Sequence, residues 1–174
     1  MNELQMAARR RPRRKGGTLK DGERRQLARA SRHAAQPQSA PELGDWPRLL
    51  CDGGSRGNPG PAAAAAVLLA ADGEPVGHRA ELIGHASAAE AEYRAILIGL
   101  ALAAQHGADP LEIRSDSQLA ITALDGGEPA APELAAFVHE IRAATTKLSA
   151  VRWRWHPRGE NERADALVRA LLWP

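Results

Sequence analysis

The order of strand-like and helix-like segments is the feature that most restricts the fold of this chain. Three strand-like segments come first, and the Asp72-Gly73 dipeptide between the second and third predicts a hairpin. Helical and strand patterns then alternate. Strands are expected at 48–52, 62–71, 75–83, 111–115 and 151–155, and helices at 89–105, 117–124, 132–148 and 161–172. The alanines of 62–71 would also suit a helix. The order predicts an α/β fold, with a meander of three strands followed by helix-linked parallel strands.

Charge is distributed unevenly and indicates two regions. Residues 1–40 contain 11 Lys/Arg and three Asp/Glu, which gives a net charge of +8. Residues 41–174 contain 12 Lys/Arg and 18 Asp/Glu, which gives a net charge of −6. We interpret residues 1–44 as a basic extension, disordered or partly helical, and residues 45–174 as the folded domain. The basic end implies an anionic partner, most simply nucleic acid. The acidic domain would repel such a partner unless clustered carboxylates hold divalent metal.

Composition limits the compartment. Hydrophobic residues make up 44% of the chain, which is enough for a core. The single cysteine, Cys51, excludes an internal disulfide and fits a reducing compartment, so we expect a cytoplasmic protein. Cys51 follows two leucines and is interpreted as a buried filler rather than a nucleophile. There is no apolar run of about 18 residues and no secretory signal, so we expect no membrane association.

Four acidic residues lie at places where a domain of this kind can gather its chemistry. Asp52 ends the first strand, Glu92 lies near the start of a helix, Asp116 follows the strand 111–115, and Asp165 lies on the last helix. Each has an ordinary explanation too: Asp52 could start a turn, Asp116 could cap a helix, and Asp165 could be a solvated charge. Ends of strands that lead into helices are nevertheless where α/β folds place their sites.

Glu92 has the least ordinary position of the four. At about 100° per residue, Glu92 shares a helix face with Ala95, Ile96 and Gly99, which should be buried. A carboxylate on such a face is costly unless it is paired or binds metal. A glutamate favoured by the dipole at the helix start is the alternative. Glu90 lies on the opposite side, four residues before Arg94, and is interpreted as an exposed ion pair.

Four motifs resemble those of the type 1 ribonuclease H family, in the same order. They are Cys51-Asp52-Gly53-Gly54-Ser55-Arg56-Gly57-Asn58-Pro59-Gly60-Pro61-Ala62, Ala91-Glu92-Tyr93-Arg94-Ala95, Ser115-Asp116-Ser117-Gln118-Leu119 and Glu160-Asn161-Glu162-Arg163-Ala164-Asp165-Ala166-Leu167. The pattern is most similar to the archaeal and Gram-positive branch. The resemblance implies a five-stranded mixed sheet flanked by helices, and an endonuclease that cuts the RNA strand of RNA–DNA hybrids.

The resemblance also implies a chemistry. Asp52, Glu92, Asp116 and Asp165 would be the ligands of two Mg²⁺ ions, with Asp52 bridging them, and Mn²⁺ could substitute. One ion would activate the water that attacks the phosphate, and the other would stabilise the leaving 3′ oxygen, which leaves a 5′-phosphate and a 3′-hydroxyl. No obligate protein partner is evident, and we expect a monomer.

Contacts to the hybrid follow from the same resemblance. The segment Gly53–Gly60 is expected to be a loop whose backbone can approach a shallow minor groove. The candidate contacts within it and beyond are Gly53, Gly54, Ser55, Arg56, Asn58 and Gln118. A flexible turn is the alternative interpretation of so many glycines.

The chain departs from the family pattern in four places. Ala88-Ala89 replace two asparagines that help to grip the substrate. His156 is the candidate for the family's catalytic histidine, but it lies one residue closer to Asp165 than usual; Arg158 could take its place, and His156 could be a surface residue at a strand end. The stretch 148–151 leaves no room for a basic protrusion. The extension lacks the aromatic residues of the family's hybrid-binding module.

Two rival functions remain open from the sequence. One is a non-catalytic protein that keeps the fold and binds RNA or hybrids through its basic extension. The other is a different nuclease of the same fold, such as a resolvase or a transposase-like enzyme, although these lack the glycine-rich opening and the two motifs that follow it.

Deletion of residues 1–40 tests whether the basic extension replaces the missing contacts. We expect weaker binding of a hybrid and a smaller dependence of affinity on salt, because these contacts would be made to phosphates without regard to sequence. Binding of the full and shortened chains at several salt concentrations measures both. An unchanged affinity and salt slope would leave the extension as a solubilising leader.

Overall fold

The computed structural model describes residues 46–174, and the basic extension predicted for residues 1–44 lies outside them. Five strands form one sheet in the order β3-β2-β1-β4-β5. The elements in chain order are β1 (Arg48–Ser55), β2 (Gly60–Leu69), β3 (Pro75–Ala86), α2 (Ala88–Gln105), β4 (Leu111–Ser115), α3 (Gln118–Leu124), η1 (Pro132–Leu134), α4 (Ala135–Thr145), β5 (Val151–Trp155), η2 (Arg158–Glu160) and α5 (Glu162–Leu172). The predicted order of strands and helices is confirmed.

Strand pairing follows the lengths of the connections. β1, β2 and β3 are joined by short turns and pair antiparallel, while β4 pairs in parallel with both β1 and β5 across helical connections. Gly73 lies in the β2–β3 turn with a φ of 95°, a left-handed conformation that favours glycine. The predicted mixed sheet of three antiparallel and then parallel strands is therefore confirmed.

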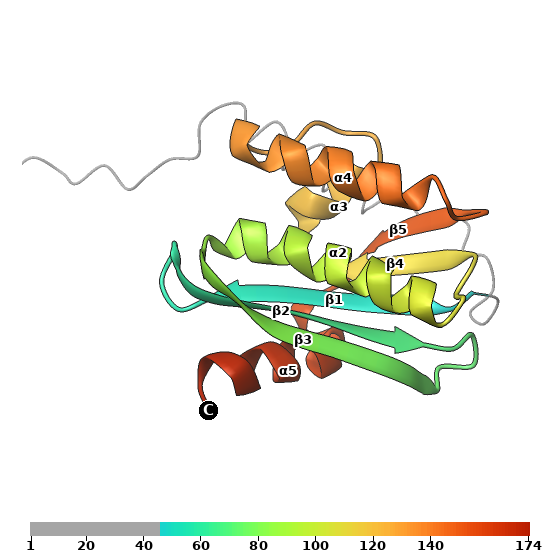
Figure 1. Cartoon of the computed structure of the whole chain (residues 1–174), viewed down its shortest axis with the longest axis horizontal. Helices are drawn as coiled ribbons and strands as arrows, with labels where there is room; N and C mark the ends of the chain where they lie inside the picture. Colours follow the sequence, from blue (N-terminus) through green and yellow to red (C-terminus); the bar gives the residue numbers. More distant parts are fainter. Residues whose placement is uncertain (1–45) are drawn as a thin grey trace, which may run out of the picture.

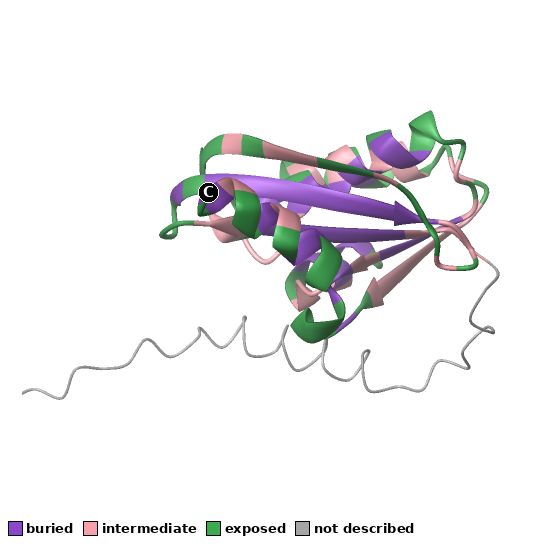
Figure 2. Ribbon diagram, turned by 90° about the horizontal axis from the view of Figure 1, so that it is seen from below, coloured by how far each residue is buried: buried purple, intermediate pink, exposed green. Residues whose placement is uncertain are grey.

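Helices cover both faces of the sheet (Figure 1). On one face, α2 and α4 bury Tyr93, Ile96 and Ile141 against Leu49 of β1 and Ile113 of β4. On the other face, α5 packs on the first three strands and contributes two further apolar clusters. The central strands are mostly buried, while the outer elements reach solvent (Figure 2). Within residues 46–174, no helix is long and apolar enough to span a membrane.

The alanine-rich segment forms strand β2, as predicted, for a tertiary reason. Ala62, Ala63, Ala64, Ala65 and Ala66 are all at most 1% exposed, because β2 lies between α2 on one face and α5 on the other. Short side chains on both faces let two helices approach one strand closely. Burial between two layers has therefore overridden the helix preference of alanine.

Some predicted boundaries are wrong. β1 continues to Ser55, so the predicted loop 53–60 is reduced to residues 56–59. β3 runs to Ala86, and the expected helix 132–148 is a short 3₁₀ turn followed by α4, which ends at Thr145. Gly53 and Gly54 belong to the sheet because they pair with Ala64 and Ala63. Glycines in a sequence usually indicate a loop, but at these two positions close packing explains them.

Gly53 lets α2 contact the sheet at backbone distance. A Cβ atom at this position would lie 2.2 Å from the carbonyl carbon of Ala91 and 2.4 Å from the amide nitrogen of Glu92. Gly99 plays a similar role further along α2, because its Cβ would lie 2.7 Å from Cδ2 of Leu49. The distance between β1 and α2 is therefore set by two missing side chains.

Gly53→Ala is expected to lower the free energy of unfolding by about 2–3 kcal/mol, since the backbone of α2 must move away to admit a methyl group. Urea denaturation of the folded chain measures this change. Gly159→Ala is the matched control, because a Cβ atom there meets nothing within 4 Å. Equal stability of the two variants would show that the close approach of α2 is not needed.

Candidate active site

Three of the four predicted acidic residues converge at one end of the sheet. One carboxylate oxygen from each of Asp52, Glu92 and Asp116 lies within 4.8 Å of the others. The register explains two of them: Cys51 of β1 pairs with Ser115 of β4 in parallel, so the residues that follow, Asp52 and Asp116, are neighbours. The third comes from α2, whose backbone contacts Gly53 next to Asp52.

Asp52 is a nearly fully buried carboxyl group. It is 1% exposed, and its Oδ2 atom has no hydrogen-bond partner among the described residues. Burial, followed by the charges of Asp116 and Asp165, raises its pKa from 3.8 to about 7, although Arg158 and Arg169 act in the opposite direction. A buried oxygen without a hydrogen-bond partner, beside other carboxylates, fits the requirements of a cation ligand.

Glu92 points toward the sheet, as its helix face predicts. The Ser115 hydroxyl donates a hydrogen bond of 3.2 Å to its Oε2 atom, and the Gly53 amide is a further donor. Burial and the charges of Asp52 and Asp116 nevertheless raise the pKa of Glu92 well above its ordinary value. The alternative of a glutamate that reaches solvent at the helix start is wrong, because the carboxylate is in the cluster.

Glu90 has a different partner from the one expected. It forms a capping box with Ser87: its carboxylate accepts from the Ser87 amide at 2.8 Å, and its own amide donates to the Ser87 hydroxyl at 3.1 Å. Hydrogen bonding with Ser87 is the main cause that lowers the pKa of Glu90, and the charge of Arg94 is a smaller one. Glu90 therefore starts the helix that carries Glu92, and the predicted exposed pair with Arg94 is only a secondary effect.

Asp116 is not the cap of α3. Ser117 is the N-cap residue, and its hydroxyl accepts from the Ala120 amide at 3.4 Å. The Asp116 carboxylate is thereby left for the cluster. Its backbone carbonyl accepts a 3.0 Å hydrogen bond from the indole of Trp155, which fixes the end of β4 against β5.

Asp165 lies near the cluster but outside the group of three. Its side chain is 11% exposed and bonds Arg158 at 3.1 Å and Arg169 at 2.8 Å. The charge of Asp165 contributes to the raised pKa of Asp52, which places the two residues near one another. The alternative of a solvated charge is wrong. Arg169 follows Asp165 by four residues on a helix, a spacing that could have predicted the pair.

His156 is buried rather than a surface residue. It is 4% exposed, and neither ring nitrogen has a hydrogen-bond partner within residues 46–174. Burial and the charge of Arg114 lower its pKa, although Asp116 and Glu160 act in the opposite direction. The imidazole beside Asp116 therefore stays neutral at physiological pH, with one nitrogen able to accept a proton. Arg158, the other candidate, is the ion-pair partner of Asp165.

The predicted substrate contacts divide into two groups. Gly53 is buried against α2, and Gly54 is half-buried beside α5, where a Cβ would lie 3.2 Å from Val168. The contact of their backbone with nucleic acid stays a prediction. Ser55 is half-buried at the end of β1, while Arg56 and Asn58 are exposed in the following turn. Asn58 accepts a 3.0 Å hydrogen bond from the Ala88 amide. Gln118 is half-buried at the start of α3.

Asn161 belongs to the last of the four motifs, but no role was predicted for it from the sequence. It is fully buried, and its side-chain amide donates to the Cys51 carbonyl at 2.8 Å. Its backbone carbonyl accepts a hydrogen bond of 3.0 Å from the Asp165 backbone amide. Asn161 thus ties α5 to the strand residue before Asp52. Its place in the motif was the one sequence signal, and nothing local indicates that its partner is Cys51. Cys51 is buried, as predicted, and burial raises its thiol pKa.

Comparison with known proteins places the chain in a family. Residues 50–171 match a family model described as reverse transcriptase-like. Ribonuclease HI of Halobacterium salinarum is 39% identical over 76% of this chain and 67% of its own length. Bifunctional protein Rv2228c of Mycobacterium tuberculosis is 36% identical over 69% of this chain, but the match spans only 34% of that protein.

Solved structures agree with the sequence comparison. The crystal structure of RNase H1 from Halobacterium salinarum matches with a TM-score of 0.69 and 40% identity, over 72% of this chain and 96% of that one. The N-terminal RNase H domain of Rv2228c from Mycobacterium tuberculosis matches with a TM-score of 0.70 and 32% identity, over 72% of this chain and 92% of that one. LC11-RNase H1 comes from a compost metagenome and was crystallised with an RNA/DNA hybrid. That structure matches with a TM-score of 0.69 and 27% identity, over 72% of this chain and 96% of its own. The chain belongs to the type 1 ribonuclease H family.

Proposed function

We propose that this protein is an endonuclease that hydrolyses the RNA strand of RNA–DNA hybrids and leaves a 5′-phosphate and a 3′-hydroxyl. The observation that carries the proposal is the cluster of Asp52, Glu92 and Asp116, whose oxygens lie within 4.8 Å of one another. The same group of relatives includes one crystallised with an RNA/DNA hybrid. A monomer in the cytoplasm is part of the proposal.

The donor set fits a hard divalent cation such as Mg²⁺ or Mn²⁺. All three clustered groups offer carboxylate oxygens, and the buried Oδ2 of Asp52 lacks a partner among the described residues. Asp52, Glu92, Asp116 and Asp165 would hold two ions. Such ions, when bound, would activate the attacking water and stabilise charge on the leaving oxygen.

The protein's own residues would prepare this site. The Ser115 hydroxyl and the Gly53 amide orient Glu92, and Asn161 holds α5 against the strand that carries Asp52. Arg158 and Arg169 hold the Asp165 carboxylate in place. His156, neutral and beside Asp116, would accept a proton during turnover, and Arg56, Asn58 and Gln118 would contact the nucleic acid together with the backbone near Ser55.

In the absence of metal, repulsion within the acidic cluster should measurably lower the free energy of unfolding. The folded-state pKa of Asp52, about 7, lies above its ordinary value of 3.8, so this group favours the folded state at low pH and loses that contribution as pH rises toward 8. His156 acts in the opposite sense up to about pH 6.5, since burial lowers its pKa. Comparing wild type with Asp52→Asn isolates the aspartate.

In chelator, Asp52→Asn is therefore expected to be more stable than wild type, by a margin that grows by about 2–4 kcal/mol between pH 5 and pH 8. Denaturant unfolding at each pH measures the margin. Added Mg²⁺ should stabilise wild type at pH 8 but not Asp52→Asn. Glu140→Gln, at an exposed position, is the control with the same loss of charge. A margin that stays constant with pH would contradict the raised pKa.

Cleavage of labelled substrates tests the activity itself. We expect wild type with Mg²⁺ or Mn²⁺ to cut the RNA strand of a hybrid, to leave double-stranded DNA intact, and to lose activity in chelator; activity on double-stranded RNA is measured in parallel. Asp52→Asn should lower the rate by at least about 100-fold, because it removes the central ligand. Equal, near-zero rates for wild type and variant would instead favour the non-catalytic binder.

A further inference from the structure

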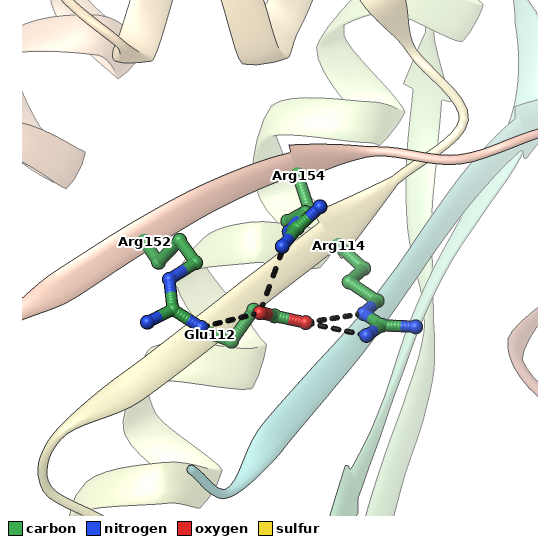
Figure 3. Close-up of polar contacts among 4 residues, drawn as sticks. All are labelled: Glu112, Arg114, Arg152 and Arg154. Atoms are coloured by element: carbon green, nitrogen blue, oxygen red, sulfur yellow. Dashed lines mark hydrogen bonds and ion pairs between the residues drawn. The ribbon is translucent and has the colours of Figure 1, made fainter. Parts of the chain in front are cut away.

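Among residues 46–174, helix α5 covers mainly the half of one sheet face that is formed by the first three strands. α5 packs on β1, β2 and β3, while β4 and β5 extend beyond it (Figure 1). Residues of β4 and β5 alternate between the two faces: Leu111 and Ile113 enter the core under α2, whereas Glu112, Arg114, Arg152 and Arg154 lie together on the opposite face (Figure 3).

Three arginines share one carboxylate on this face. Glu112 accepts from Nε of Arg114 at 2.6 Å and from Nη1 of Arg152 at 3.1 Å, and its Oε2 lies 3.5 Å from Nε of Arg154. The glutamate side chain is only 6% exposed, whereas the arginine side chains are 23–32% exposed. Against the effect of burial, hydrogen bonds from Arg114 and Arg152 hold the pKa of Glu112 below its ordinary value.

The charges on this face do not balance. Within the cluster of Glu112, Arg114, Arg152 and Arg154, one carboxylate neutralises one of three guanidinium groups, so a net charge of +2 remains. Arg114 and Arg154 are directly opposite in the β4–β5 register, an arrangement of like charges that destabilises a sheet. Each guanidinium has five N–H donors, and the two oxygens of Glu112 can accept only a few of them. The face is therefore suited to an additional anion.

The arginines are also held in position. The guanidinium of Arg152 lies over the ring of Trp46, 4.2 Å from its centroid, and Arg114 is held by Glu112 through two nitrogens. Arg152 and Arg154 are two residues apart on one strand, about 7 Å, which suits successive groups of an extended polyanion. Beside Arg114 lies a cavity of about 300 Å³ whose lining carries charges of both signs, from Arg48 and Arg163 as well as Glu160 and Glu162.

We propose that Arg114, Arg152 and Arg154, with Trp46, form a second nucleic-acid contact that binds the phosphates of a single strand outside the carboxylate cluster. Planar guanidinium forks match phosphate oxygens, and an aromatic ring beside them is typical of surfaces for single strands. The chain's own residues 1–40 carry a net charge of +8 and would be repelled. Arg114 lies two residues before Asp116, so this contact leads to the catalytic end of the sheet.

Binding of a fluorescent 20-nucleotide DNA strand to the full chain, in chelator, tests this contact without any cleavage. Arg152→Gln/Arg154→Gln is expected to lower the affinity about tenfold and to reduce the slope of log affinity against log salt by about 1.4, since two phosphate contacts are lost. Arg79→Gln/Lys147→Gln removes the same charge from exposed positions elsewhere and should change the affinity at most about twofold. Equal losses in the two double variants would overturn the proposal.

Glu112→Gln supplies a result of opposite sign that misfolding cannot imitate. It removes the competing negative charge and leaves the three arginines, so the DNA affinity should rise about threefold; a fall in a variant that remains folded contradicts the proposal. Arg152→Gln alone, which leaves Arg114 bonded to Glu112, replaces the double variant if that does not fold. Polyglutamate is the second probe: if the arginine variant loses only polyglutamate binding, the face belongs to an acidic protein segment.

Discussion

The contact between the backbone of α2 and Gly53 is the constraint on which the rest of this structure depends. A helix normally lies at a distance from a sheet that its side chains set. Here a Cβ at Gly53 would come within 2.4 Å of three backbone atoms of Ala91 and Glu92, so the helix lies directly on the strand. That closeness lets a helical carboxylate join Asp52 of β1, and it lets the Gly53 amide donate to Glu92.

Burying neighbouring carboxylates is unfavourable, and packing of the core must offset this free energy. Asp52 is buried and Glu92 is half-buried, each beside the other and beside Asp116, and loss of solvent together with these neighbouring charges raises the pKa values of both. Two large apolar layers, one under α2 and α4 and one under α5, hold the strands and helices that carry them. Arg158 and Arg169 offset part of the charge at Asp165. The three clustered carboxylates repel one another, which is the physical reason that this group could hold a metal ion.

Prediction from the sequence succeeded where local pattern and packing agree, and failed where packing alone decides. The strands 111–115 and 151–155 were predicted with the bounds observed, because their apolar residues are bounded by turn signals or helix starts. Gly53 and Gly54 were interpreted as loop residues, since nothing local shows that two helices approach them. Glu92 could be predicted because helical periodicity aims it at the core. Asn161 could not, because its partner, Cys51, is 110 residues away.

The sequence by itself determined the order of elements, the meander followed by parallel strands, and the four acidic residues on separate segments, because these follow from periodicity and turn chemistry. Only the tertiary structure decided that three carboxylates share one site while Asp165 is held by arginines, that His156 is buried, and that Glu112 gathers three arginines on one face of β4 and β5. These features depend on strand register and on the distance between layers, and both arise from contacts between residues far apart in the chain.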